Sequence, residues 1–397
     1  MTKDATGGSD PTIRSLEGSF CCHTTKHKPK AKGNKEQKAT RIQANDNCKM
    51  SIESVPTVDI SPLLNQQHSA DSPPTNDDAT KKCIEEISFA CREWGFFYIQ
   101  NHPIEAETIS SFRSTMEKFF KHTPPESLNS IRRTSNNSRG YYDDELTKGK
   151  LDWKRGFDFG AQDGSLDNRG MDGYNQWPSS KRDDDNNNAN FETIMRDYFH
   201  QMENLSKILL GAICSGLGMK SDALKQHFDT NHTSYLRLNY YPVCPDPSNH
   251  LAIHHHTDAG ALTILYQDDD ISSLQVYKDD AWHYVPPRKD TFVINIGDMI
   301  QVWSNREYIA PLHRVQANEG KERFSAPFFY NPSYETDVEP LRVVGLVGDN
   351  YSSLGGGPKY KTINWGKFRA QRFAGDFADL GEEIQISHFL KDTDEEA

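Results

Sequence analysis

The sequence predicts an α+β protein with a mainly β core that helices flank on both sides in the chain. From about residue 233, short runs of β-branched and aromatic residues alternate with Pro, Asp, Asn and Gly, a spacing typical of a sandwich or jelly roll. Before this region, segments beginning at residues 81, 105 and 191 space their apolar residues at helical intervals. After it, residues 365–381 place Trp365, Phe368, Phe373 and Phe377 like the buried stripe of a helix.

The order of the elements follows from these runs. VPTVDIS (55–61) is β-rich, and the helix beginning at residue 81 leads into the strand FFYI (96–99). Residues 105–121 and 191–217 are expected to be helices, with Gly216 and Gly218 as stop signals for the second. The strands of the core are then SYLRLNYY, LTILYQ, SLQVY, WHYVP, TFVINIGD and RFSAPFFY.

Two polar stretches divide the chain. Residues 1–54 lack clustered apolar side chains and cannot offset their own ordering entropy, which predicts a disordered tail. Asp, Asn, Gly and Ser dominate residues 161–190, which predicts an exposed loop. The expected parts are the tail (1–54), an N-terminal region of the fold (55–160), the polar loop (161–190), supporting helices (191–232), the jelly-roll domain (233–345), and a C-terminal helical segment with its tail (346–397).

Charge, cysteine content and the length of apolar runs limit the ligands and the compartment that we expect. The net charge of −12 at pH 7 argues against nucleic acid as a ligand. The seven cysteines have neither disulfide-framework nor paired zinc spacing, which favours a reducing compartment. The chain has no run of about 18 apolar residues and no secretory signal. We therefore expect a cytoplasmic protein, by default a monomer, that contacts no membrane; the basic N-terminal tail leaves an organellar address open.

A histidine run at residues 254–256 raises the question of a metal. On a strand, His256 and Asp258 would share one face, whereas His255 would point to the other. His313, in LHRV, completes two histidines and a carboxylate, the facial triad of non-haem Fe(II) oxygenases. His254 is two residues before His256, so on a strand it would share the face of the ligands. It either lines the entrance to the site or is an exposed loop residue. Taken alone, an HxD pattern is also compatible with solvated or structurally hydrogen-bonded side chains.

Many ordered motifs between residues 55 and 335 decide between these interpretations. The chain resembles the Fe(II)- and 2-oxoglutarate-dependent dioxygenases of the plant-type group that also contains isopenicillin N synthase and anthocyanidin synthase. The resemblance implies a double-stranded β-helix of the jelly-roll kind, with His256, Asp258 and His313 as the iron ligands. The motifs that carry it are VPTVDIS, CREWGFFYIQNH, RLNYYPVCPDP, HTDAGALTILYQDD, SLQVY, NIGDMIQVWSN, LHRV and ERFSAPFFYNP.

A carboxylate clamp follows from strand alternation. Arg323 and Ser325 lie on one strand face, where a guanidinium fork and a hydroxyl could hold one carboxylate. The resemblance assigns that carboxylate to 2-oxoglutarate; the alternative is a surface arginine on an edge strand. In YLRLNYY, the alternation puts Arg237, Asn239 and Tyr241 on one face. The resemblance places Asn239 and Tyr241 beside 2-oxoglutarate, although Tyr241 could equally be a packing residue.

Two residues are candidates for contacts with the organic substrate. The resemblance directs Arg237 and Phe329 toward the substrate, which would favour an acidic or aromatic small molecule. The alternatives are a salt bridge for Arg237 and a core position for Phe329. Residues 139–160 either help to wall the pocket, with Tyr142 and Phe157 as contacts, or form a solvated charged face.

The function implied is oxidation of a small organic molecule, by hydroxylation or desaturation. Fe(II) is the expected cofactor, and 2-oxoglutarate and O2 are the expected cosubstrates, with 2-oxoglutarate converted to succinate and CO2. Two alternatives stay open at this point. One is an Fe(II) oxidase of the same fold that does not use 2-oxoglutarate; the other is a non-catalytic jelly-roll binding protein.

Overall fold

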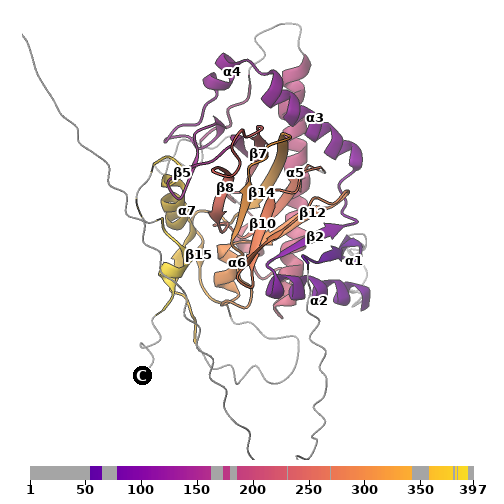
Figure 1. The fold of residues 1–397 in the computed structure, drawn as a ribbon. Helices are drawn as coiled ribbons and strands as arrows, with labels where there is room; N and C mark the ends of the chain where they lie inside the picture. Colours follow the sequence, from indigo (N-terminus) through magenta and orange to yellow (C-terminus); the bar gives the residue numbers. More distant parts are fainter. Residues whose placement is uncertain are drawn as a thin grey trace, which may run out of the picture. The chain divides into compact units, whose positions relative to one another are not determined.

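The computed structural model describes residues 54–64, 78–161, 173–178, 186–229, 231–268, 270–341, 357–378, 381 and 383–391, without side chains for residues 186–189. Nearly all of the expected tail, most of the polar loop and the start of the C-terminal segment therefore lie outside the described residues. The described strands form two main sheets and two small two-stranded ones. Figure 1 shows the strands enclosed by helices.

The larger sheet has eight strands in the order β1-β2-β12-β9-β14-β7-β6-β3. The smaller sheet has four strands in the order β11-β10-β13-β8. This pair of sheets confirms the predicted jelly roll. The strand bounds are β1 Thr57–Asp59, β2 Phe96–Gln100, β3 Gly140–Tyr142, β6 Arg155–Gly160, β7 Tyr235–Tyr241, β8 Leu251–His256, β9 Leu262–Gln267, β10 Leu274–Lys278, β11 Ala281–Tyr284, β12 Phe292–Ile296, β13 His313–Gln316 and β14 Arg323–Tyr330; the small pairs are β4 Leu146–Thr147 with β5 Lys150–Leu151, and β15 Asp337–Val338 with β16 Ile363–Asn364.

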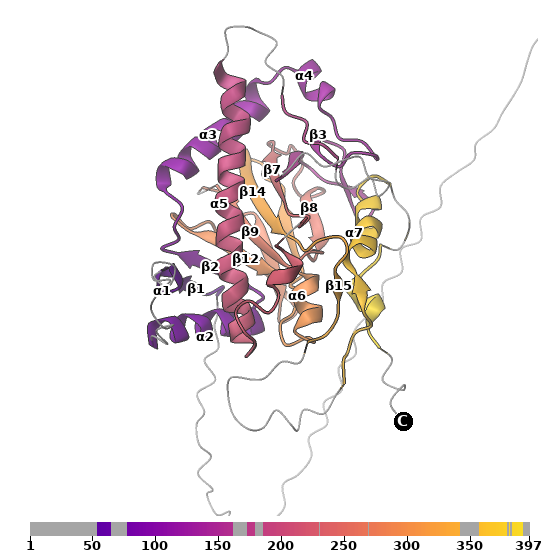
Figure 2. The same ribbon diagram turned by 180° about the vertical axis from the view of Figure 1, so that it is seen from behind.

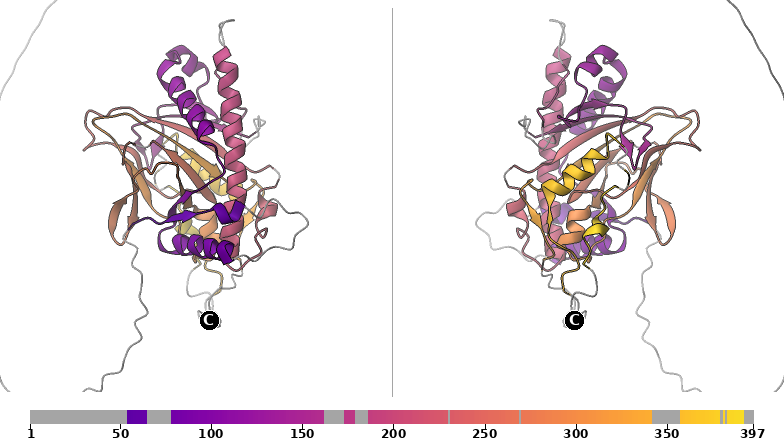
Figure 3. Two further views of the ribbon diagram at one scale, coloured as in Figure 1. Left: turned by 90° about the vertical axis from the view of Figure 1, so that its right-hand side faces the viewer. Right: turned by 90° about the vertical axis from the view of Figure 1, so that its left-hand side faces the viewer.

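Helices cover the two sides of these sheets unequally. The long helix α5 packs on strands β9 and β14 and also contacts α2 and α3 (Figure 2). The C-terminal helix α7 lies on the opposite side of the sheets from α5 (Figure 3). No described helix is both long and apolar enough to cross a membrane. The helix bounds are α1 Ser61–Leu64, α2 Asp78–Glu93, α3 Ala106–His122, α4 Pro125–Ser130, α5 Asn186–Gly216, α6 Asp298–Trp303 and α7 Trp365–Ala374, with 3-10 turns at Lys225–His227 and Ile386–Phe389.

Strand alternation divides the interior into two regions. On β7, Leu236 and Leu238 belong to the main apolar cluster that also contains the buried helix faces. On β14, Phe324 and Phe328 belong to the same cluster, and Phe328 packs edge to face on Phe199 of α5, with ring centroids 4.9 Å apart. The alternate residues of both strands therefore face the smaller sheet, where a second and smaller apolar cluster leaves room for polar side chains.

Three local features differ from the sequence predictions. Strand β12 ends at Ile296, before the end of the predicted strand TFVINIGD, because the chain turns at Gly297 into the short buried helix α6. The helix α7 ends at Ala374, so Phe377 lies beyond its last turn, where it packs edge to face on Phe373. The helix α5 begins at residue 186, inside the stretch predicted to be a loop.

The interpretation of residues 139–160 as a solvated charged face holds only for part of the segment. Strand β6 joins the larger sheet beside β7, and β3 pairs with β6. Part of its charge is almost fully buried, with Glu145, Asp152 and Asp158 each 3% exposed and Lys154 5% exposed. Asp143, Asp144, Lys150 and Arg155 are exposed. Tyr142 and Phe157 are fully buried, and neither of them lines the cavity described below. The segment does wall the pocket, through Glu145 to Lys148 and Lys154.

The turn before β2 requires a glycine, and this requirement can be tested by mutation. Gly95 has φ +61°, and a Cβ atom there would lie 2.6 Å from the Ile309 carbonyl oxygen and 2.8 Å from Cδ of Pro311. We predict that Gly95→Ala lowers the free energy of unfolding by more than about 1 kcal/mol in urea denaturation, because alanine is strained there and the space is occupied. Gly320→Ala is the matched control, since a Cβ would meet nothing within 4 Å. Equal stability of the two variants would contradict this.

Candidate active site

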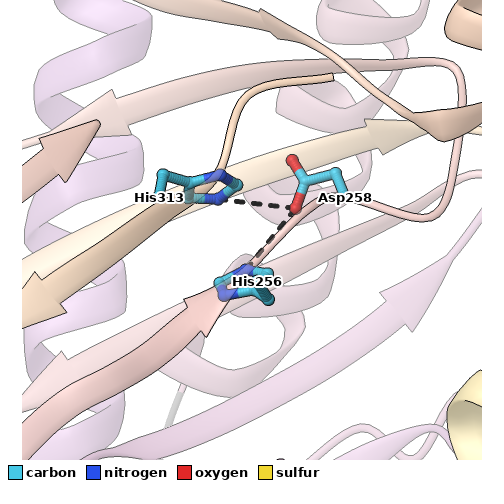
Figure 4. A group of neighbouring side chains, drawn as sticks. All are labelled: His256, Asp258 and His313. Carbon is cyan, nitrogen blue, oxygen red and sulfur yellow. Dashed lines mark ion pairs between the residues drawn. The ribbon is translucent and has the colours of Figure 1, made fainter. Parts of the chain in front are cut away.

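A cavity between the two sheets brings together side chains from distant parts of the chain. It is lined from the larger sheet by alternate residues of β7 and β14, and from the smaller sheet by β8 and β13. Three potential metal ligands lie at its centre: His256 at the end of β8, Asp258 two residues later, and His313 at the start of β13 (Figure 4). Each offers one ligand atom, and these atoms all lie within 4.8 Å of one another.

The register of two strands creates this arrangement. His256 and His313 are direct partners in the antiparallel pair of β8 and β13, so their rings project to the same side. Nε2 of each ring is 3.6 Å from Oδ1 of Asp258. Strand β8 ends at His256, so Asp258 reaches the site from the following turn and not, as the sequence predicted, from the same strand.

Hydrogen bonds fix how both rings point. Nδ1 of His256 lies 2.8 Å from the His254 carbonyl oxygen, and Nδ1 of His313 lies 3.1 Å from the Pro311 carbonyl oxygen. A carbonyl oxygen only accepts, so each Nδ1 must carry the proton and each Nε2 keeps its lone pair. Burial and the neighbouring His313 lower the pKa of His256, which favours the neutral ring that binds metal.

Asp258 is oriented in the same way. Its Oδ2 accepts hydrogen bonds from Thr263 Oγ1 at 2.5 Å and Asn295 Nδ2 at 2.7 Å, which leaves Oδ1 toward the histidines. Burial raises the pKa of Asp258, but the two imidazoles and these hydrogen bonds outweigh burial, so the pKa is lowered and the group is ionised. Two neutral imidazoles and one carboxylate suit a divalent transition-metal ion and leave coordination positions open.

A second polar group lies deeper, on the larger sheet. Arg323 is 1% exposed, and its Nη2 donates to Oε1 of Gln267 at 3.1 Å. Its Nε and Nη1 are buried without a hydrogen-bond partner among the described residues. Ser325 lies on the same face, with Oγ 3.1 Å from the Tyr241 hydroxyl, and the Tyr241 ring lies 4.9 Å from the guanidinium carbon of Arg323. A buried cation with unpaired donors fits a carboxylate that enters the cavity.

Comparison with known proteins identifies the fold family. Residues 232–332 match the model of the 2OG-Fe(II) oxygenase superfamily, and residues 55–180 match the N-terminal model of non-haem dioxygenases in morphine synthesis. The chain is 34% identical over 298 residues to jasmonate-induced oxygenase 2 of Arabidopsis thaliana, covering 74% of this chain and 75% of that protein. The chain belongs to the 2OG-Fe(II) oxygenase superfamily.

Solved structures agree with this assignment. A crystal structure of JOX2 in complex with 2OG, Fe and JA superimposes with a TM-score of 0.67 at 29% identity, covering 85% of this chain and 89% of that one. A full-length Neurospora crassa protein, in complex with alpha-KG and 5-formyluracil, gives a TM-score of 0.66 at 25% identity, covering 81% of this chain and 96% of that one. The predicted cofactors are thereby confirmed: this oxygenase uses Fe(II), 2-oxoglutarate and O2 to oxidise a small organic molecule.

The residues predicted to bind iron or 2-oxoglutarate all line the cavity, and so do Arg237 and Phe329. Asn239 and Tyr241 of β7 face Arg323 and Ser325 of β14 across the strand pair, in the register Ser325 to Asn239 and Arg323 to Tyr241. Phe329 also lines the cavity and stacks on Tyr235 at a centroid distance of 4.7 Å, so it is not part of the core. The geometry is compatible with the predicted roles, which stay predictions.

Arg237 forms salt bridges, which was the alternative to a contact with the substrate. Nη2 of Arg237 lies 2.8 Å from Asp158 Oδ2 and 3.0 Å from Glu145 Oε1, so two carboxylates already compensate its charge. Glu145 also pairs with Arg133 and Lys154, which makes it the centre of a buried charge cluster. The sequence does not reveal this cluster, because its partners come from separate segments and no residue spacing relates them.

His254 and the C-terminal helix supply contacts that the sequence did not predict. His254 is not an exposed loop residue: its backbone N and its Nδ1 both lie within hydrogen-bond distance of Asp152 Oδ1, at 3.2 and 3.0 Å. Arg372 of α7 donates to the Thr257 carbonyl oxygen at 2.8 Å, directly between the ligands His256 and Asp258. His255 is exposed, as expected for the opposite strand face.

The hydrogen bonds to Asp258 give a test of the metal centre. We predict that Thr263→Val weakens Fe(II) binding about 10- to 100-fold, because it removes one of the two donors that orient the carboxylate. Anaerobic titration with Fe(II) measures this. Thr291→Val is the matched control, since the Thr291 hydroxyl bonds to the Arg288 carbonyl oxygen outside the cavity lining. Equal Fe(II) affinity of Thr263→Val and the wild type would show that this donor does not position the ligand.

Proposed function

We propose that His256, Asp258 and His313 hold the Fe(II) of this oxygenase, and that Arg323 and Ser325 hold the distal carboxylate of 2-oxoglutarate. Asn239 and Tyr241 complete the cosubstrate site. The observation that carries the proposal is the Arg323 guanidinium, which is buried in the same cavity as the three ligands with two nitrogens unpaired among the described residues. An unpaired buried cation is costly unless a ligand compensates its charge.

The protein's own part in the reaction is to bind, orient and shield. Bound iron and 2-oxoglutarate supply the oxidising power, since reduction of O2 is coupled to conversion of 2-oxoglutarate to succinate and CO2. His256, Asp258 and His313 would hold the ion and would leave coordination positions open to the cosubstrates. Arg323 and Ser325 fix the orientation of the keto acid from its far end. Apolar side chains of the second cluster, among them Phe96, Leu265 and Val315, line the same cavity and limit water.

The organic substrate occupies the part of the cavity between Phe329, Tyr235 and helix α7. The outcome we propose is hydroxylation or desaturation of a small molecule. A monomer in the cytoplasm is part of the same proposal. The irregular cysteine spacing supports a reducing compartment such as the cytoplasm.

The clamp and the metal site are tested together by anaerobic spectroscopy. Chelation of iron by the keto acid gives a weak metal-to-ligand charge-transfer band in the visible range. We predict that the band forms in the wild type, is lost in His313→Ala, and needs more than about ten times as much 2-oxoglutarate in Arg323→Ala. A lost charge-assisted hydrogen bond of about 1.5–3 kcal/mol accounts for that factor.

The control is Arg155→Ala, which removes an exposed arginine of β6 that does not line the cavity. A band with unchanged 2-oxoglutarate dependence in Arg323→Ala would overturn the clamp assignment. Iron binding without any band in the wild type would point instead to an oxidase that does not use 2-oxoglutarate.

A further inference from the structure

Arg369 is a cation of the cavity that forms no ion pair with a described residue. Lys154, Arg237 and Arg372 form ion pairs with carboxylates, and Arg323 is assigned to the cosubstrate. Arg369 of α7 lines the same cavity without a hydrogen bond or ion pair to any described residue. Its charge is therefore available to a ligand.

Aromatic rings hold the Arg369 guanidinium in place. Its central carbon lies 5.1 Å from the centre of the Tyr235 ring and 5.4 Å from that of Phe373. Tyr235 in turn stacks on Phe329. Arg369, Tyr235 and Phe329 therefore form a continuous wall from α7 to the face of β14 that carries Arg323 and Ser325. The Tyr235 hydroxyl likewise has no hydrogen-bond partner among the described residues. Cation–π contacts orient a guanidinium but leave its in-plane N–H donors free.

The carboxyl group of Asp376 interacts electrostatically with Arg369 but compensates its charge incompletely. Burial and the neighbouring Glu145 raise the pKa of Asp376 to about 7, so at neutral pH this group is only partly ionised. Lys148, another cavity cation without an ion pair to a described residue, lies in the β4–β5 turn, where burial lowers its pKa although Glu383 opposes this. The substrate side of the cavity thus combines an apolar aromatic wall with a fixed positive charge.

We propose that the organic substrate is a carboxylic acid whose carboxylate binds Arg369 and the Tyr235 hydroxyl while its apolar body lies along Tyr235 and Phe329. This rests on the proposed function. A single planar guanidinium matches the two oxygens of a carboxylate, whereas a phosphate dianion would call for further cations, and Arg237 and Arg372 already pair with carboxylates. The assignment moves the acid-binding role from Arg237, which the sequence favoured, to Arg369.

Matched acids and amides test this directly. The probes are phenylacetic, phenylpropionic, cyclohexylacetic and cyclohexylbutyric acids, each with its primary amide, and the readout is substrate-stimulated succinate release. We expect acids and not amides to stimulate the wild type. We expect Arg369→Gln to raise KM for the acid at least about tenfold with a smaller change in kcat, and Arg369→Lys to fall between.

Lys367→Gln is the matched control, because it removes the same charge from an exposed position of the same helix. The anaerobic charge-transfer band, recorded for every variant, reports separately whether iron and 2-oxoglutarate bind. If the band forms but amides stimulate as well as acids, no acid stimulates, or Arg369→Gln keeps the wild-type KM, the carboxylic acid assignment is wrong. If the band is absent in the wild type, the proposed function fails and this inference fails with it.

Discussion

The active site depends on the register between strands β8 and β13. Because side chains alternate along a strand, a slip of one residue would turn either His256 or His313 away from its partner and leave no triad. The carboxylate ligand is fixed to the same frame by its backbone, since the Asp258 carbonyl oxygen accepts from the amide of Asp298, the first residue of α6. The six-residue helix α6 therefore matters to the chemistry although none of its side chains lines the cavity.

The site retains charges that the fold itself does not neutralise. The Glu145 cluster balances its buried charges internally and ties the segment around residues 133–158 to β7. Arg323 and Arg369 differ, because neither forms an ion pair with a carboxylate among the described residues of the cavity. Unpaired buried charge lowers the stability of the unliganded protein, and this cost is offset only when anions bind. This contrast separates residues that hold the fold from residues that select ligands.

Sequence patterns with a fixed period are sufficient to predict many of the residues that line the active site. The period of two places Asn239 and Tyr241 of β7, and Arg323 of β14, on the cavity side, and the family motifs select His256 out of three neighbouring histidines. Contacts between distant segments are beyond such patterns. Nothing local in the sequence shows that Asp152 binds His254, or that Arg237 meets Glu145 and Asp158. Such partners are determined by how the strands pack, and not by spacing along the chain.

The most direct test of the whole account is a crystal structure of the protein grown anaerobically with Fe(II) and 2-oxoglutarate. We expect iron bonded to Nε2 of His256, Oδ1 of Asp258 and Nε2 of His313, with the distal carboxylate of 2-oxoglutarate paired to Arg323. Iron held by His254 or by other donors would contradict the account. A distal carboxylate bound to Arg369, with Arg323 left unpaired, would contradict it equally, because the cosubstrate would then occupy the position assigned to the substrate.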